Sequence, residues 1–175
     1  MRDGSRKSMY FLYNCQSLLA QTCHISMDTH SSDNNSMQNL AVTNALVAGS
    51  NVFGLLPLLQ ANTTTQALIA ITAVSASTLM HLSERKHDLP GIAPFSKWFI
   101  AFLWFDRMVA LGAGGYVACK FARNMSAIPW ELVLIGLPAL ALPEHVEGGP
   151  IWFATTHSAW HISAYLTMAI AFGLD

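Results

Sequence analysis

Charged residues are scarce in this chain of 175 residues. Only 11% are Asp, Glu, Lys or Arg, whereas 53% are hydrophobic, which is far from the composition of an ordinary soluble protein. Ten acidic and nine basic residues leave a net charge of -1. Nucleic acid is not an expected partner, because no basic surplus is present to attract phosphate groups. The composition places the chain in the membrane class.

Cysteine is also rare. The three cysteines are odd in number and form no CxxC pair; they are Cys15, Cys23 and Cys119. Neither a disulfide framework nor a cysteine-rich zinc module is therefore indicated.

Long runs without charge are the main feature that the sequence does have. The fifty residues Asn34–Ser83 contain no Asp, Glu, Lys or Arg and are interrupted by the polar stretch Gln60–Gln66. Because a helix rises about 1.5 Å per residue, about 20 residues cross a hydrocarbon core of roughly 30 Å. The pattern predicts five membrane helices at Asn39–Leu59, Thr64–Ser83, Trp98–Phe121, Ile128–Leu142 and Pro150–Gly173.

The expected fold class is therefore all-α, a polytopic transmembrane bundle of about five spans. The fourth helix is shorter and contains Pro138, so it is either a kinked span or a re-entrant segment. Residues 39–175 form the expected membrane domain, and residues 1–38 form an N-terminal tail that is flexible or lies at the membrane interface.

Basic residues predict the orientation of these helices. With five crossings, one face of the membrane carries Arg2, Arg6, Lys7, Arg85, Lys86 and Lys97, and the other carries only Lys120 and Arg123 near its loops. The positive-inside rule places the first face in the cytosol. The organelle stays open between the plasma membrane, the endoplasmic reticulum and the Golgi apparatus.

Polar and ionisable residues inside three of the helices fall at a similar depth. Ser77 and His81 share one side of the second helix, as do His157 and His161 on the last, because each pair has an i, i+4 spacing. Asp106 lies about 12 Å into the third helix, and the two histidines of the last helix lie about 10 to 17 Å from its start. All three helix ends face the same side, so these groups are expected to meet in one layer.

Three neutral imidazoles suit zinc and leave a fourth tetrahedral position for water, which a nearby carboxylate can orient or deprotonate. Each residue alone has a simpler interpretation. His81 can be a hydrogen-bonded packing residue, and the HxxxH pair equally suits haem or copper. Ser77 can bond back to its own helix, and Asp106 can belong to an ion pair or a proton relay.

The ordered set of Ser77-x3-His81, Asp106 and His157-x3-His161 on successive apolar helices resembles the CREST superfamily of membrane hydrolases. That superfamily includes alkaline ceramidases, progestin and adiponectin receptors and post-GPI-attachment lipases. The stretches "ASTLMHLSERKHDLPGI" and "THSAWHI" look most like its myomaker-like branch. The family has seven helices, two more than the five expected here.

The resemblance implies a Zn²⁺ ion bound by His81, His157 and His161, with Asp106 hydrogen-bonded to the metal-bound water and Ser77 in the polar surroundings. It implies hydrolysis of an amide or ester bond in a membrane lipid, so the expected partners are that lipid and the bilayer, with a second copy of the chain a further candidate. The alternative is a noncatalytic membrane protein with a structural zinc and a receptor or membrane-remodelling role. A transporter or proton relay without metal is a third hypothesis.

Overall fold

The computed structural model describes residues 34–87, 89–146 and 148–174. Within these residues every regular element is a helix, so the predicted all-α helical bundle is confirmed. The predicted tail at residues 1–38 lies outside the described part of the chain, apart from residues 34–38, which begin the first helix.

The first predicted helix is a rod of three consecutive segments. It consists of the α-helix α2 (Asn34–Gly49), the 3₁₀-helix η1 (Ser50–Gly54) and the α-helix α3 (Leu55–Gln60). At Gly54 an added Cβ atom would lie against the side chains of Val74 and Tyr165, with Tyr165 Cε1 at 3.3 Å. The absence of a side chain at Gly54 therefore lets the rod approach two neighbouring helices closely.

Helix α4 (Thr64–Ser83) has the bounds that the sequence predicts. Thr63 forms a capping box, because its side chain accepts a hydrogen bond from the backbone N–H of Gln66 while Gln66 Oε1 accepts one from the backbone N–H of Thr63. Gln66 is fully buried and also donates to the backbone carbonyl of Phe172 at 3.5 Å, which ties the start of α4 to the end of the last helix.

The remaining elements follow the predicted order. In chain order they are η2 (Phe95–Trp98), α5 (Phe99–Arg123), η3 (Met125–Ala127), α6 (Trp130–His145) and α7 (Gly149–Phe172). Helix α6 contains Pro138 and Pro143. At Gly136 an added Cβ atom would lie 2.9 Å from Ser163 Cβ, so this glycine allows the close packing of α6 on α7.

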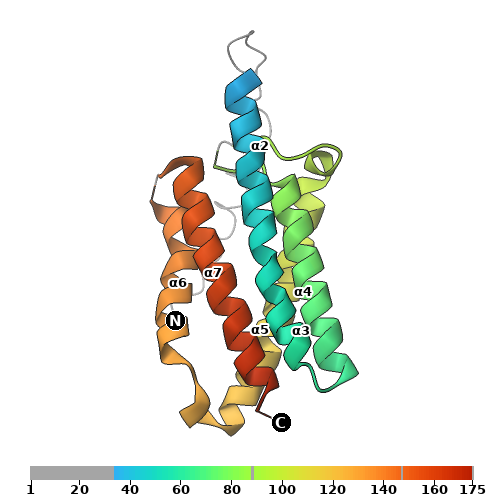
Figure 1. Ribbon diagram of the computed structural model, residues 1–175, viewed down its shortest axis with the longest axis vertical. Helices are drawn as coiled ribbons and strands as arrows, with labels where there is room; N and C mark the ends of the chain where they lie inside the picture. The colour runs from blue at the N-terminus through green and yellow to red at the C-terminus, as the bar shows by residue number, and fades with distance from the viewer. Residues whose placement is uncertain (1–33, 88, 147, 175) are drawn as a thin grey trace, which may run out of the picture. The chain divides into compact units, whose positions relative to one another are not determined.

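Helix α7 lies in the middle of the bundle and contacts α2, η1, α3, α5 and α6. Figure 1 shows α7 between α6 on one side and the α2–α3 rod on the other, while α4 packs against both the rod and α5. One hydrophobic cluster joins α4, α5 and α7 through Ala70, Ala113, Met168 and Phe172. A second cluster of Val47, Leu89 and Phe153 lies at the other end of α7.

Three helical stretches among the described residues are long and apolar enough to cross a membrane. They are Leu40–Gln60, Thr64–Ser83 and Phe95–Arg123. Helix α6 is apolar but shorter, and α7, although 24 residues long, is not one of the three because its histidines and hydroxyl side chains dilute its apolar character. Large apolar side chains are exposed along the bundle, including Leu59, Leu111 and Leu134. Such a surface is suited to lipid, and the protein is a membrane protein.

Candidate metal centre

Three histidines from two helices meet inside the bundle. His81 lies in the last turn of α4, and His157 and His161 lie one turn apart on α7. One ligand atom from each imidazole lies within 4.8 Å of the others. His81 and His161 are buried, with 1% and 4% of their surfaces exposed, and His157 is half-buried. The structure therefore brings together the three imidazoles that the sequence singles out.

One nitrogen–nitrogen distance in this cluster agrees with that between two ligands of a metal ion. The ring centroids are 4.6 Å apart for His81 and His157 and 4.9 Å apart for each of the other two pairs. Nε2 of His81 is 3.2 Å from Nε2 of His161. Two nitrogen ligands of a tetrahedral zinc, each about 2.0 to 2.1 Å from the metal, are themselves about 3.3 Å apart. The three residues could hold a metal ion.

Each of the two buried imidazoles also has a partner on its outward-facing nitrogen. Nδ1 of His161 is 2.6 Å from Ser50 Oγ, and Nδ1 of His81 is 3.2 Å from Glu84 Oε2. Glu84 is itself buried, with 4% of its surface exposed. Asn44 reaches from α2 and donates to the backbone carbonyls of His81 and Glu84 at 2.9 and 3.1 Å. Partners of this kind orient metal ligands in many proteins.

Aromatic rings cover the loop side of the cluster. Phe153 stacks on His157 with a centroid distance of 5.0 Å, and His87 stacks on the same phenylalanine at 4.3 Å. Phe153 is 3% exposed and belongs to the buried cluster with Val47 and Leu89. Apolar and aromatic side chains therefore pack against this side of the histidine cluster.

Ser77 and Asp106 are placed differently relative to the histidines. Ser77 Oγ lies 3.2 Å from Nε2 of His161, so this hydroxyl group borders the candidate metal position. Asp106 is half-buried on α5 and lies within electrostatic range of Glu84, Arg107 and Tyr165. The carboxylate that bonds to His81 is that of Glu84.

Three further residues belong to this centre that the sequence-based prediction does not include: Ser50, Glu84 and Asn44. Glu84 has a usable signal, because it follows His81 at an i, i+3 spacing that brings the two side chains together at a helix end. Ser50 and Asn44 have none, since they lie in a long uncharged stretch whose contacts depend on tertiary packing. The sequence also does not single out Tyr165, which lies one helical turn after His161 on α7. Its hydroxyl group donates a hydrogen bond to Asn51 Oδ1 at 2.6 Å.

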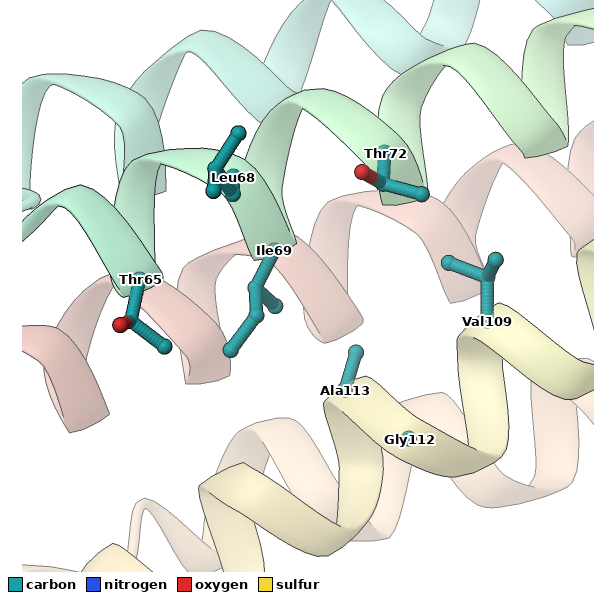
Figure 2. Close-up of a pocket in the computed structure, with 7 residues that line it drawn as sticks. All are labelled: Thr65, Leu68, Ile69, Thr72, Val109, Gly112 and Ala113. Carbon is teal, nitrogen blue, oxygen red and sulfur yellow. The ribbon is translucent and has the colours of Figure 1, made fainter.

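An apolar groove of about 310 Å³ runs between α4 and α5. Figure 2 shows the two helices facing each other across it, lined by Thr65, Leu68, Ile69, Thr72, Val109, Gly112 and Ala113. Val109 lies one helical turn from Asp106, on the same side of α5. The groove therefore ends close to the aspartate.

Comparison with known proteins identifies no relative. No protein-family model matches the chain, and neither the curated proteins nor the solved structures include a significant match. The class of the protein therefore follows from its own fold and site: an all-α membrane protein with a three-histidine candidate metal centre inside its helix bundle.

Proposed function

We propose that the protein is a multi-pass, zinc-dependent membrane hydrolase that cleaves an amide or ester bond of a lipid, related to the CREST superfamily and closest to its myomaker-like branch. The observation that carries the proposal is the 3.2 Å separation of the Nε2 atoms of His81 and His161, with His157 as the third member of the cluster. A three-histidine set leaves one tetrahedral position for water or substrate, which is the arrangement of catalytic rather than structural zinc sites.

Each side chain at the centre has a role in this proposal. His81, His157 and His161 would hold the zinc ion, which when bound would supply Lewis-acid chemistry and an activated water. Asp106 would act as the general base and then the general acid: it would take one proton from the attacking water and give it to the leaving amine or alcohol, as the water oxygen joins the acyl carbon and the C–N or C–O bond breaks. Ser77 donates a hydrogen bond to the carbonyl oxygen of the substrate.

The groove between α4 and α5 supplies a place for a lipid acyl chain. Its lining is apolar, it lies between two helices that are apolar enough to cross the membrane, and it ends one turn from Asp106. An acyl chain in the groove would bring the linkage at its end toward the aspartate and the histidine cluster. The proposed partners are therefore the lipid substrate and the surrounding bilayer.

The proposed topology has five membrane crossings, with α6 and α7 added to the three strongly apolar helices. The centre then lies toward the cytosolic face, because the basic residues Arg85, Lys86 and Lys97 follow α4 on the same side as His81. Labelling of cysteines introduced singly into the loops of a cysteine-free chain, in intact membranes, tests this topology.

Metal content tests the zinc centre. Purified full-length protein should contain about one zinc ion per chain by mass spectrometry, and His161→Ala should lose it. His145→Ala is the matched control, because this histidine is exposed at the end of α6, away from the cluster. Wild-type protein that holds no more zinc than His161→Ala after metal reconstitution would disprove the proposal.

A noncatalytic protein with a structural zinc is the second candidate. The observation in its favour is that the carboxylate bonded to a cluster histidine is Glu84 and not Asp106. Asp106→Asn separates the two candidates. In the hydrolase this variant keeps its zinc but loses at least about 100-fold in turnover of a lipid amide or ester, because the proton acceptor is gone. A zinc protein that turns over no lipid in either form is the noncatalytic one.

A further inference from the structure

Two hydrogen bonds from outside the histidine set determine which nitrogen of each buried imidazole faces the centre. The first is made by Ser50, in the 3₁₀ segment of the α2–α3 rod. Its hydroxyl group lies 2.6 Å from the backbone carbonyl of Val47 and 2.6 Å from Nδ1 of His161. A serine hydroxyl has a single hydrogen to donate.

The direction of the Ser50 contact follows from this count. The carbonyl of Val47 can only accept, so the hydrogen of Ser50 points to it and the serine oxygen is left as the acceptor toward His161. Nδ1 of His161 must then carry the ring hydrogen. In a neutral imidazole the other nitrogen, Nε2, is left with a free lone pair, and this is the atom that faces His81 and Ser77.

Glu84 has the same effect on His81. A carboxylate oxygen is an acceptor, so the contact of 3.2 Å places the ring hydrogen on Nδ1 of His81 and frees Nε2. Asn44 holds both ends of this contact, because its amide group donates to the backbone carbonyls of His81 and of Glu84. The two Nε2 lone pairs consequently face each other across 3.2 Å, held there by the partners of the two Nδ1 atoms, and a metal ion between them would be bound by both.

We propose that Ser50 and Glu84 are positioning residues that hold His81 and His161 in the Nδ1–H form, so that their Nε2 atoms are ready to bind the metal together. The α2–α3 rod and the end of α4 thus preorganise the centre without supplying a ligand. This inference rests on the proposed zinc centre and adds to it the two side chains that set the affinity for the metal.

Zinc affinity tests the inference directly. Competition between the purified full-length protein and a zinc chelator of known affinity should show a loss of about 10- to 100-fold in Ser50→Ala and in Glu84→Leu, the usual cost of removing such a partner. Ser50→Thr and Glu84→Gln keep an acceptor and should keep most of the affinity. Ser83→Ala is the matched control, since Ser83 is buried and also bonds back three residues, to Met80, but does not contact a histidine.

The ring hydrogen itself gives a second readout that a purely structural role would not change. Nitrogen-15 NMR of metal-free protein labelled at histidine should show Nδ1–H for His81 and His161, assigned by single substitution. Ser50→Ala should move the hydrogen of His161 to Nε2, whereas Ser83→Ala should not. The inference can be tested even if Ser50→Ala folds poorly, because the wild-type spectrum alone shows which nitrogen of His161 carries the hydrogen.

The outcomes separate the inference from the proposed function. If the wild type binds zinc, and Ser50→Ala and Glu84→Leu bind it with the same affinity as Ser83→Ala, the inference is wrong. The proposed zinc centre would not be affected by that result. Nε2–H on His161 in the metal-free wild type would overturn it as well. A wild type that binds no zinc would overturn both.

Discussion

The interior between α2, α4 and α7 differs sharply from the outward surfaces of α5 and α6. In the first candidate membrane span, Leu40–Gln60, 44% of the apolar window is buried within the protein, against 6% for Phe95–Arg123, which contains α5. The interior region contains the histidines, Asn44, which bonds to the backbone of His81, and Asn51, which bonds to Tyr165. The outer helices instead expose large apolar side chains such as Leu111 and Leu134.

This contrast follows from the cost of polar groups in lipid. A polar side chain within the membrane has to find a partner in the protein, so the polar residues gather where helices pack on several sides. The outward faces of α5 and α6 need few such partners, because most of their exposed side chains are apolar and suited to lipid. The same substitution should therefore have very different effects in the two regions, which the following pairs of variants examine.

The largest difference is expected for glycine to leucine. At Gly54 even a Cβ atom would clash with Val74, so Gly54→Leu should destabilise the fold by more than about 3 kcal/mol or prevent folding. At Gly112 an added Cβ atom meets nothing within 4 Å, and Gly112→Leu should fold. Expression level and thermal unfolding in detergent measure the pair; equal yields of the two variants would contradict the contact at Gly54.

Gly112→Leu also tests the groove. It should lower lipid turnover at unchanged zinc content, because a leucine side chain there enters the space proposed for the acyl chain. Gly114→Leu is the control, since Gly114 is equally open but does not line the groove. Unaltered turnover in Gly112→Leu would count against the acyl chain as its occupant.

The second pair is leucine to alanine. Leu89 is 4% exposed and packs with Val47 and Phe153 above the histidines, so Leu89→Ala should cost about 2 to 5 kcal/mol of unfolding free energy. Leu111 is 73% exposed on α5, and Leu111→Ala should stay within about 0.5 kcal/mol. Denaturation with sodium dodecyl sulfate from mixed micelles measures both; a comparable loss at Leu111 would indicate that another chain covers that face.

The sequence predicts the helices well because their determinants are local. Runs without charge and the polar stretch before α4 place four of the five helices within a few residues of their observed bounds. The 3₁₀ segment at Ser50–Gly54 could not be predicted, since it depends on the close approach of Gly54 to Val74 and Tyr165, which are distant in sequence.

In the candidate centre, too, some features follow from local sequence and others depend on how the helices pack. Helical rise gives the depth of a residue in the membrane, and depth alone predicts that the three histidines share a layer with Asp106. It does not give the rotation of α5 about its axis relative to α4 and α7, which decides what the aspartate contacts. The predicted helix Thr64–Ser83 ends just before the charged residue Glu84, and nothing in its charge indicates that the structure buries it against His81.

The third pair is asparagine to alanine. Asn44 is fully buried and donates to two backbone carbonyls at the end of α4, so Asn44→Ala should cost about 2 kcal/mol, roughly 1 kcal/mol per hydrogen bond. Asn124 is exposed at the end of α5, and its alanine variant should change stability by less than about 0.5 kcal/mol. Unfolding of metal-free protein measures both, so that loss of zinc does not enter the comparison.

The smallest difference is expected for tyrosine to phenylalanine. Tyr165→Phe removes the hydroxyl group that donates to Asn51, which is 2% exposed, and leaves the asparagine oxygen without that donor at a cost of about 1 to 2 kcal/mol. Tyr116 on α5 packs edge-on against Phe172 through its ring, so Tyr116→Phe keeps the contact and should be nearly neutral. Unfolding measured for both variants gives the comparison at the level of one hydroxyl group. If the two variants cost the same, the buried hydroxyl group of Tyr165 contributes no more to stability than the hydroxyl group of Tyr116 on α5, and the distinction between the two regions would rest on packing alone.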